Sequence, residues 1–460
     1  MARTIHKGLF HRRLTLKDRL AAGKKLRDKA PRSSQARWVS PKDRVDPIAL
    51  LRESDRGRLP ALLPIRYARM RESPFAFFRG SAALMAADLA STPVTGIRVQ
   101  ACGDCHVANF GGFGTPERHL VFDIDDFDET LRAPWEWDVK RLAASVVLAM
   151  RQAGFAERYC SGAAFIAAES YRRHMREYAE MTALDVWYSH LNAALFIERA
   201  KSPEARKRWR KLEAGAALDS SEREFPKMTV MRRGRLRIID RPPLIYHARE
   251  MAAGEKVRRM FRQYRATLPE ERRILLDRYE LVDVARKVVG VGSVGTRCAV
   301  ALLAAGPRDF LLLQFKEAHA SVLAPYAGKG RYANQGERVV TGQRLLQSAS
   351  DIFLGWTSDG QGHDFYFRQL RDMRMKIDIE TMSKQDWIEY VELCGWVLAH
   401  AHARTGDPAR IAGYLGKSDA FDEAIAKFAV SYADQTERDY ASFVKAIRAG
   451  RLPVRPASSA

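Results

Sequence analysis

The sequence predicts an α+β protein of two lobes, a larger one that is predominantly helical and a smaller one built on an antiparallel sheet. Residues 135–273 have mostly helix-forming composition, and helices are expected again after Ser383 and over 420–449. Between them lie short β-branched runs separated by turns, with one helical run inserted. The expected strands are 282–289, 298–303, 310–315, 352–356 and 365–370, and the inserted helix is 338–348.

These patterns divide the chain of 460 residues into four segments. The segments are a basic N-terminal arm over 1–45, the helical lobe over 46–275, the small sheet lobe over 276–375, and helices over 376–460 that complete the large lobe. Within the helical lobe, short strands are expected at 97–101 and 120–124. Ser383 and Asp386 form a capping-box pattern, which predicts that a helix begins there.

Half of the net charge of +22 lies on the arm. Residues 1–44 contain 14 Lys or Arg and three Asp, a balance of +11. A basic arm of this kind can bind nucleic acid or an acidic membrane surface. Because aromatic residues are sparse there and no nucleic-acid-binding motif follows, we favour an amphipathic helix that packs its few Leu on the body of the protein.

Hydropathy and cysteine content indicate a reducing environment. No apolar run approaches the ~20 residues that a membrane span needs. The N-terminus carries charges where a secretion signal has an apolar segment. The five Cys are scattered and odd in number, which does not fit a disulfide framework. We therefore expect no membrane span and a cytoplasmic location.

The most informative stretch is residues 102–129, CGDCHVANFGGFGTPERHLVFDIDDFDE. It holds Gly103, Asp104, His106 and Asn109 in a G-D-x-H-x-x-N pattern, followed by a strand-like run and the acidic cluster DIDDFD. Carboxylates at this density repel one another, and a fold tolerates them mainly when a cation or a proton relieves the repulsion. The cluster therefore points to a site that involves a cation or a shared proton.

Two alternatives use the cysteines of this stretch instead. Cys102, Cys105 and His106 match the Cys-x-x-Cys-His pattern of haem c attachment. That attachment normally takes place outside the cytoplasm, so we do not favour it. The same residues are also candidates for a structural zinc site, but such a site needs four ligands and no second ligand pair lies nearby.

The alternative that uses the carboxylates is phosphoryl transfer. Kinase chemistry needs a carboxylate that accepts the proton of the substrate hydroxyl, and an amide and a second carboxylate that hold Mg²⁺ on the phosphates of ATP. Asp104 and Asn109 have the Asp-x-x-x-x-Asn spacing of the base and the amide. Asp126 follows the strand at 120–124 and is the expected second ligand, with Asp123 as a competitor.

A second motif supplies the other half of such a site. A G-x-G-x-x-G loop lies between two expected strands and contains Gly290, Gly292, Ser293 and Gly295. Lys316 lies in the next strand, and Glu337, at the start of the next helix, is its expected partner. Backbone amides of a glycine loop can approach phosphate, and a Lys on the adjacent strand neutralises its charge.

The two motifs occur in the reverse of the order found in ordinary kinases, where the glycine loop precedes the catalytic loop. Here the Asp104 loop comes first by almost 190 residues. A circular permutation explains this order, because it moves the chain ends and keeps the spatial neighbours. We therefore expect a protein-kinase-like fold with its two lobes in circularly permuted order.

Six segments resemble a known bacterial family, domain of unknown function 2252. They are SPFAFFRGSAALMAADLA, CGDCHVANFG, VFDIDDFDE, PWEWDVKRLAAS, GVGSVGTR and DIFLGW, and the similarity extends from about Gly23 to Gly450. That family is grouped with the protein-kinase-like superfamily, and its loop resembles that of aminoglycoside phosphotransferases. The resemblance implies that Asp104 is the base, that Asn109 and Asp126 bind the metal and that Lys316 anchors phosphate. It also implies that Asp138 braces the catalytic loop, to which His106 belongs.

The function predicted from the sequence is ATP- and Mg²⁺-dependent phosphoryl transfer to a hydroxyl-bearing acceptor, with a small molecule favoured over a protein. The alternatives are nucleotide binding without turnover, and nucleic-acid binding through the basic arm. The expected ligands are ATP, Mg²⁺ and an acceptor that the sequence does not identify. From its place in the topology, the region between Glu157 and Arg273 is expected to form the acceptor pocket.

Overall fold

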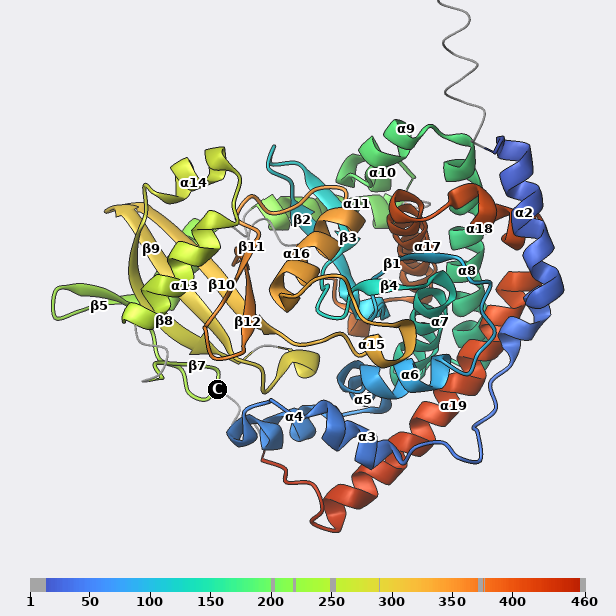
Figure 1. Ribbon diagram of the computed structural model, residues 1–460, viewed down its shortest axis with the longest axis horizontal. Coiled ribbons are helices and arrows are strands. Elements are labelled where there is room, and N and C mark those ends of the chain that lie inside the picture. The colour runs from blue at the N-terminus through green and yellow to red at the C-terminus, as the bar shows by residue number, and fades with distance from the viewer. Residues whose placement is uncertain are drawn as a thin grey trace, which may run out of the picture.

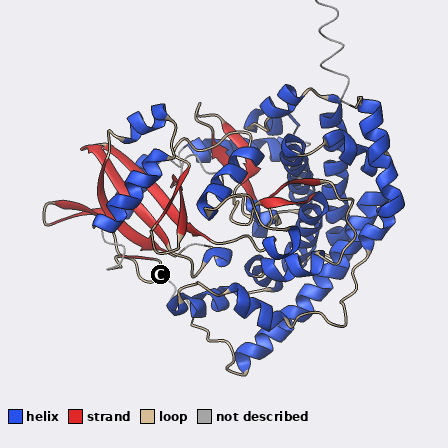
Figure 2. Ribbon diagram, in the orientation of Figure 1, coloured by secondary structure: helices blue, strands red, loops and turns tan. Residues whose placement is uncertain are grey.

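The computed structural model describes residues 14–199, 203–217, 221–248, 254–288, 290–370, 375 and 377–455. The chain is an α+β protein, which confirms the predicted class. A six-stranded sheet lies at one side and the long helices lie at the other (Figure 1). Of the smaller two-stranded sheets, those formed within residues 98–134 lie among the helices, whereas the one formed by residues 229–238 lies beside the six-stranded sheet (Figure 2). No helix in the described ranges is long and apolar enough to cross a membrane.

The six-stranded sheet is antiparallel throughout, with strand order β11-β12-β10-β9-β8-β7. The strands are β7 Ile245–Tyr246, β8 Glu280–Lys287, β9 Cys298–Gly306, β10 Asp309–Ala318, β11 Gly355–Ser358 and β12 Asp364–Gln369. Helix α16 (Gln335–Leu346) lies between β10 and β11 in the chain. The strand predicted at 352–356 begins only at Gly355, because Asp351 binds the N–H of Phe353 and holds the preceding residues in a turn.

Helices α13 (Glu255–Ala266) and α14 (Glu270–Leu276) pack on this sheet. Val257, Met260 and Tyr264 recur every three or four residues along α13, so they form one apolar face. The ring of Tyr264 stacks on that of Phe367 with centroids 4.0 Å apart. Residues 255–276 therefore belong to the core of the sheet region, although their helical pattern placed them in the helical lobe. Periodicity shows which face of a helix is buried but not against which partner.

Four long helices form most of the helical region, α7 (Trp135–Gln152), α8 (Glu157–Glu180), α17 (Lys384–Thr405) and α19 (Ala420–Arg448). The shorter helices are α3 Pro47–Ser54, α4 Leu63–Met70, α5 Pro74–Gly80, α6 Ala82–Leu89, α9 Ala183–Tyr188, α10 Ala193–Arg199, α11 Pro203–Ala217, α12 Ser221–Met228, α15 Ala324–Ala327 and α18 Pro408–Leu415. Strand β1 Arg98–Ala101 pairs with β4 Leu131–Pro134 across the segment between them, and the two hairpins in the described ranges outside the large sheet pair β2 Phe110–Gly114 with β3 Leu120–Ile124 and β5 Thr229–Arg232 with β6 Arg235–Ile238.

Aromatic stacking and close backbone contact hold the long helices together. Trp135 of α7 stacks on Tyr171 of α8, with ring centroids 5.6 Å apart. Helices α8 and α17 approach most closely at Gly395, where an added Cβ would lie 2.2 Å from the carbonyl oxygen of Ala167. Helix α17 begins with the predicted capping box, in which Ser383 caps the N–H of Asp386.

The described part of the basic arm forms helix α2 (Leu16–Lys29), which packs on α18. Arg19 forms an ion pair with Asp407 at 2.7 Å. Arg27 donates hydrogen bonds to the carbonyl oxygens of Gly413 and Tyr414, both at 2.8 Å, at the C-terminal end of α18. Positive charge at that end is favourable, because the last carbonyls of a helix lack partners within it. Residues 1–13 of the arm lie outside the described residues.

The contact at Gly395 predicts opposite effects for two glycine substitutions. Gly395→Ala should lower the free energy of unfolding by about 1–3 kcal/mol, because its methyl group meets the backbone of α8. Gly162→Ala, on α8 with no atom within 4 Å of the new Cβ, should raise it by about 0.5–1 kcal/mol through helix propensity. Urea denaturation of both variants measures this. Equal effects would contradict the α8–α17 packing.

Candidate functional site

The G-D-x-H-x-x-N motif lies in the loop that follows β1 and leads through a 3-10 turn, Val107–Asn109, into β2. Because β1 pairs with β4, and β4 runs directly into α7, this loop, which we call the catalytic loop after its predicted role, lies beside the first turn of α7. Gly103 has φ +85°, and an added Cβ there would lie 2.2 Å from the carbonyl oxygen of Glu129. Only glycine fits this left-handed and crowded position.

Asp138, in the first turn of α7, holds the backbone of the catalytic loop. Its carboxylate accepts hydrogen bonds from the N–H groups of Cys102 at 2.6 Å and Gly103 at 3.0 Å. Nε2 of His402, on α17, lies 3.2 Å from the same carboxylate. Asp138 and His402 are both buried, so the loop depends on a carboxylate that is screened from water.

Asp104 lies among positive groups. Its Oδ1 accepts a hydrogen bond from Nε of Arg141 at 2.7 Å, and Nε2 of His106 lies 4.0 Å from its Oδ2. Burial would raise the pKa of the Asp104 carboxyl, but the charge and hydrogen bond of Arg141 and the charge of Arg79 outweigh burial and lower this pKa. Asp104 is therefore ionised at neutral pH, and its Oδ2 accepts no hydrogen bond from the described part of the chain.

Asn109 points its amide nitrogen at the backbone. Nδ2 donates hydrogen bonds to the carbonyl oxygens of Asp104 and Asp126, both at 3.1 Å. The side chain is thereby fixed between the catalytic loop and the acidic cluster. Its Oδ1 accepts no hydrogen bond from the residues that the structure describes, which leaves an oriented amide oxygen at this place.

Lys316 of β10 reaches the acidic cluster from the sheet. Its Nζ forms a short ion pair with Asp128 and lies 3.9 Å from Oδ2 of Asp126. Tyr366 of β12 donates a hydrogen bond to the other oxygen of Asp128 at 2.8 Å. The Lys316 side chain is 4% exposed, while those of Asp128 and Asp126 are 25% and 42% exposed, so Asp126 is the carboxylate most open to a ligand.

The electrostatics of these three groups are linked. Burial and the nearby charge of Asp128 raise the pKa of Asp126. At Asp128 burial acts in the same direction, but the charge and hydrogen bond of Lys316 outweigh it and lower the pKa. For Lys316, the two carboxylates outweigh burial and raise the pKa of its ammonium group. Asp128 is thus firmly paired with Lys316, whereas Asp126 lacks enough nearby positive charge to balance its own charge.

Asp123 faces a different part of the molecule. One of its oxygens accepts hydrogen bonds from the N–H and the hydroxyl of Ser348, both at 2.9 Å, and the other accepts from the N–H of Ile124 at 2.9 Å. Burial raises its pKa against these hydrogen bonds. Of the two carboxylates that the sequence left open as metal ligands, the structure brings Asp126 to Lys316 and turns Asp123 toward Ser348.

The glycine loop joins β8 to β9 and faces the acidic cluster. The hydroxyl of Ser293 lies 3.4 Å from Oδ2 of Asp128. Gly295 has φ +97°, which favours glycine. No atom lies within 4 Å of an added Cβ at Gly290.

Two arginines bind the outer side of this loop. Arg66 of α4 donates hydrogen bonds to the carbonyl oxygens of Val291 at 3.0 Å and Gly292 at 3.1 Å. Arg58 donates to the carbonyl oxygen of Val294 at 2.8 Å. The helices that precede the catalytic loop therefore fix the conformation of a loop more than 200 residues further along the chain.

Glu337 is not brought to Lys316. It lies in the first turn of α16, where Asn334 caps its N–H at 3.0 Å, and its carboxylate forms no ion pair within the described ranges. Arg338, the next residue, reaches the acidic cluster instead. It donates hydrogen bonds to the carbonyl oxygens of Thr130 at 2.6 Å and Asp128 at 2.7 Å.

Sequence reasoning did not single out Asp128, Arg141, Arg66 or Arg338. For Asp128 a signal existed, since it is the second carboxylate of Asp-Phe-Asp, two residues after Asp126. Arg141 lies three residues after Asp138 and so on the same face of α7. Arg66 and Arg338 bind backbone carbonyls far away in sequence, and no local pattern reveals such contacts.

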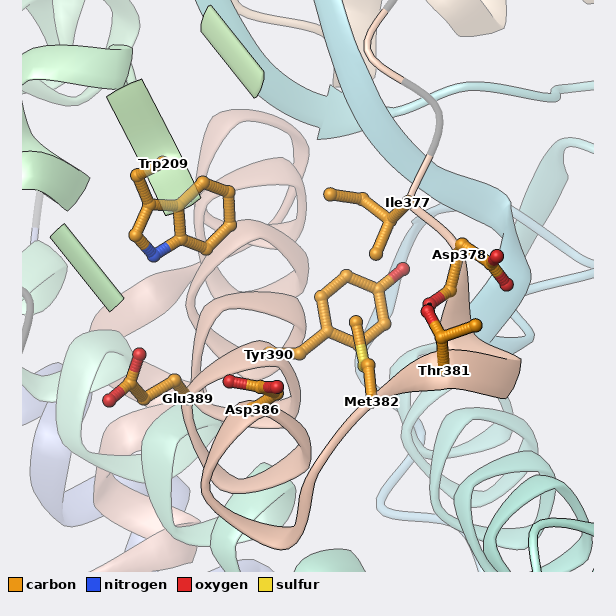
Figure 3. Close-up of a pocket in the computed structure, with 8 residues that line it drawn as sticks. All are labelled: Trp209, Ile377, Asp378, Thr381, Met382, Asp386, Glu389 and Tyr390. Carbon is orange, nitrogen blue, oxygen red and sulfur yellow. The ribbon is translucent and has the colours of Figure 1, made fainter. Parts of the chain in front are cut away.

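A cavity of 180 Å³ adjoins the catalytic loop, between the start of α17, α11 and the 3-10 turn Ile379–Thr381 (Figure 3). Apolar side chains and carboxylates line it together: Trp209, Ile377, Asp378, Thr381, Met382, Asp386, Glu389 and Tyr390. The Tyr390 hydroxyl donates a hydrogen bond to the carbonyl oxygen of Val107 at 2.7 Å, which ties the cavity wall to the loop. Trp209 comes from the region expected to form an acceptor pocket. A second cavity, of 480 Å³, is lined by Asp125 and Arg368 among others.

The cysteines of the motif are buried free thiols. Sγ of Cys102 lies 3.5 Å from the carbonyl oxygen of Asp126 and 3.7 Å from Nδ2 of Asn109. Among the residues that the structure describes, no group of three or more His, Cys, Asp or Glu is arranged to hold a metal ion. Within these ranges Cys102, Cys105 and His106 therefore do not form a closed zinc site.

Comparison with known proteins identifies the family. Residues 58–446 match the model of a family described as an uncharacterized protein conserved in bacteria, domain of unknown function 2252. The chain belongs to this family, as its segments predicted. No curated protein and no solved structure matches the chain.

His106 predicts a pH dependence of stability. Burial lowers its pKa to about 3, against the attraction of Asp104. Because this lies below the unfolded value of about 6.5, the unfolded chain binds a proton first as the pH falls, and stability is lost by about 1.4 kcal/mol per pH unit between the two values.

The His106→Gln variant should therefore lose unfolding free energy less steeply than the wild type between about pH 6 and 4.5, by up to that amount per pH unit. Urea denaturation at each pH measures the slope. His190→Gln, at an exposed position, is the control and should leave the slope unchanged. Equal slopes in the wild type and His106→Gln would contradict the burial argument.

Proposed function

We propose that this protein is an ATP- and Mg²⁺-dependent phosphotransferase whose acceptor is a hydroxyl group of a small molecule. The observation that carries the proposal is the meeting of Lys316 with Asp126 and Asp128, which are 190 and 188 residues away in sequence. A Lys on a strand next to a glycine loop and an acidic loop that follows a strand are the two halves of a kinase site.

The residues present fit a magnesium ion. Mg²⁺ usually takes one or two protein carboxylates or amides and completes its coordination with water and substrate phosphates. Asp126 is more exposed than Asp128, and Asn109, which is held by its Nδ2 at the backbone carbonyl oxygen of Asp126, has an Oδ1 that accepts no hydrogen bond from the described residues. A bound divalent cation would relieve the repulsion that raises the pKa of Asp126. Few protein ligands are therefore needed.

Each remaining residue has a role in this proposal. Lys316 and the amides of the glycine loop bind the phosphates of ATP, and Mg²⁺ withdraws charge from them. Ionised Asp104 orients the acceptor hydroxyl through its free Oδ2 and accepts its proton. The acceptor oxygen forms a bond to the γ-phosphorus as the bond from that phosphorus to ADP breaks. Positioning and electrostatic stabilisation supply most of the acceleration in this chemistry.

The order of elements supports a permuted kinase-like fold. Glycine loop, β9, Lys316 on β10, α16, β11 and β12 follow one another as the kinase interpretation requires. The catalytic loop, placed before them in the chain, is held against them by contacts across the site. The cavity beside Tyr390 is a candidate site for a small acceptor, because it adjoins the loop of Asp104.

One observation favours the alternative of nucleotide binding without turnover. Arg141 occupies one oxygen of Asp104 and lowers its pKa, which makes this carboxylate a weaker base. The nucleic-acid alternative has less support, since Arg19 and Arg27 of the arm are engaged with α18.

Turnover tests the proposal directly. The wild type with Mg²⁺ and ATP should form ADP, and Lys316→Met and Asp104→Asn should each lower kcat/KM by about 100- to 1000-fold, the usual loss for one group that stabilises the transition state. Arg158→Met, at an exposed position on α8, is the control. Circular dichroism verifies that each variant is folded. Binding of ATP without ADP formation under any acceptor screen would favour the alternative, and failure to bind ATP would refute both.

Substitution of two carboxylates, Asp126 and Asp123, should distinguish an effect on metal binding from an effect on stability. Asp126→Asn should raise the Mg²⁺ concentration needed for ATP binding by at least about tenfold, since even outer-shell partners of a metal matter this much. Asp123→Asn should lower the melting temperature, because its contacts with Ser348 are buried, and should leave the Mg²⁺ requirement unchanged. Isothermal titration of ATP at varied Mg²⁺ concentrations measures the Mg²⁺ requirement of both variants, and thermal denaturation measures their melting temperatures. A Mg²⁺ requirement that follows Asp123 and not Asp126 would show that the assignment is wrong.

A further inference from the structure

The last turn of α5 lies between the two halves of the proposed site. On the side of the glycine loop, Arg66 donates hydrogen bonds to the carbonyl oxygen of Gly80 at 2.5 Å and to those of Val291 and Gly292. One guanidinium therefore binds the end of α5 and the glycine loop together. The carbonyl oxygen of Arg79 lies 3.4 Å from an added Cβ at Gly292, so the two backbones are in near contact.

On the other side, the same turn contacts the catalytic loop. Arg141 donates hydrogen bonds to the carbonyl oxygen of Phe78 at 3.2 Å and to Oδ1 of Asp104 at 2.7 Å. Arg141 also lies over the ring of Phe78, 4.2 Å from its centroid. Residues 78–80 are thus fixed by Arg66 toward the glycine loop and by Arg141 toward Asp104.

Arg79 is the charged residue of this turn, and its guanidinium has no carboxylate partner. Its Nε is buried without a hydrogen bond, and within the described ranges Arg79 forms no ion pair. Its contact with the ring of Phe75, at 5.8 Å from the centroid, is long for a cation–π interaction. Arg66 and Arg141, by contrast, are each paired with an Asp. The Arg79 side chain is half-buried, and withdrawing part of a guanidinium from water without an anion is costly unless a ligand supplies one.

The charges of the acidic site influence Arg79. Burial lowers the pKa of Arg79, and the strongest opposing influences are the charges of Asp104 and Asp126, the proposed base and metal ligand. The charges of Glu72, just before α5, and of Glu380, in the 3-10 turn Ile379–Thr381, also raise the pKa of Arg79.

We propose that Arg79 is a catalytic residue that binds the terminal phosphate of the nucleotide between the glycine loop and Asp104. This role of Arg79 rests on the proposed function. It adds an arginine of the chain itself as a ligand of the phosphoryl group that is transferred. A planar guanidinium forms paired, charge-assisted hydrogen bonds to phosphate oxygens. Charge on the transferring phosphoryl group is stabilised in this way by arginines of other phosphoryl-transfer proteins.

Comparison of ATP with ADP tests the proposal without relying on turnover. Isothermal titration with each Mg²⁺–nucleotide should show that Arg79→Met weakens ATP binding by about 10- to 100-fold and ADP binding by less than about threefold, because only ATP has the terminal phosphate. Lys316→Met should weaken both nucleotides. Arg71→Met, at an exposed position eight residues away, should change neither. Arg79→Lys should recover part of the preference for ATP.

The outcomes are distinct. Equal loss of ATP and ADP affinity in folded Arg79→Met would overturn this role while leaving the proposed function intact. A wild type that binds neither nucleotide would overturn the proposed function and this role with it. If Arg79→Met does not fold, Arg79→Gln, which keeps a polar but shorter and uncharged side chain, replaces it in the same comparison, and an unchanged ratio of ATP to ADP affinity in that variant would equally refute the role.

Discussion

The ion pair between Lys316 and Asp128 is the interaction on which the rest of the site depends. It joins a strand of the sheet to a loop of the helical region, and it places a buried ammonium group beside two carboxylates. Removing a charge of this kind from water is favourable only when partners are close and fully oriented. Tyr366 and Ser293 supply that orientation from β12 and from the glycine loop. The Asp128 carboxylate thereby joins the sheet, the glycine loop and the acidic loop at one point.

Arginines provide the second set of constraints, and they do so mainly by binding backbone carbonyls. Arg66 and Arg58 bind the glycine loop, Arg338 binds the acidic loop and Arg27 binds the end of α18. A guanidinium offers five donors in a fixed plane, so one side chain can join two segments that have no regular hydrogen bonding to each other. Part of the large positive charge of the chain is therefore structural.

The sequence predicted the α+β class, the strands β1 and β3 nearly to the residue, and the succession of elements around Lys316, because these depend on local alternation and turn residues. It could not predict that α13 and α14 pack on the sheet, since a helix pattern does not name its partner. The same limit applies to the site. Local motifs contain four of the site residues, Asp104, Asn109, Asp126 and Lys316. The pairing of Lys316 with Asp128, and the position of Arg79 between the glycine loop and the catalytic loop, depend instead on contacts between distant segments.

The central claim is that Lys316 and the acidic cluster together bind the phosphates of a nucleotide through Mg²⁺. A crystal structure of the protein with Mg²⁺ and a non-hydrolysable ATP analogue tests it most directly. The account predicts phosphate oxygens within hydrogen-bond distance of Nζ of Lys316 and a metal ion in contact with Asp126 and with Oδ1 of Asn109. A nucleotide bound elsewhere, with the Lys316–Asp128 pair unchanged and no metal at Asp126, would contradict it.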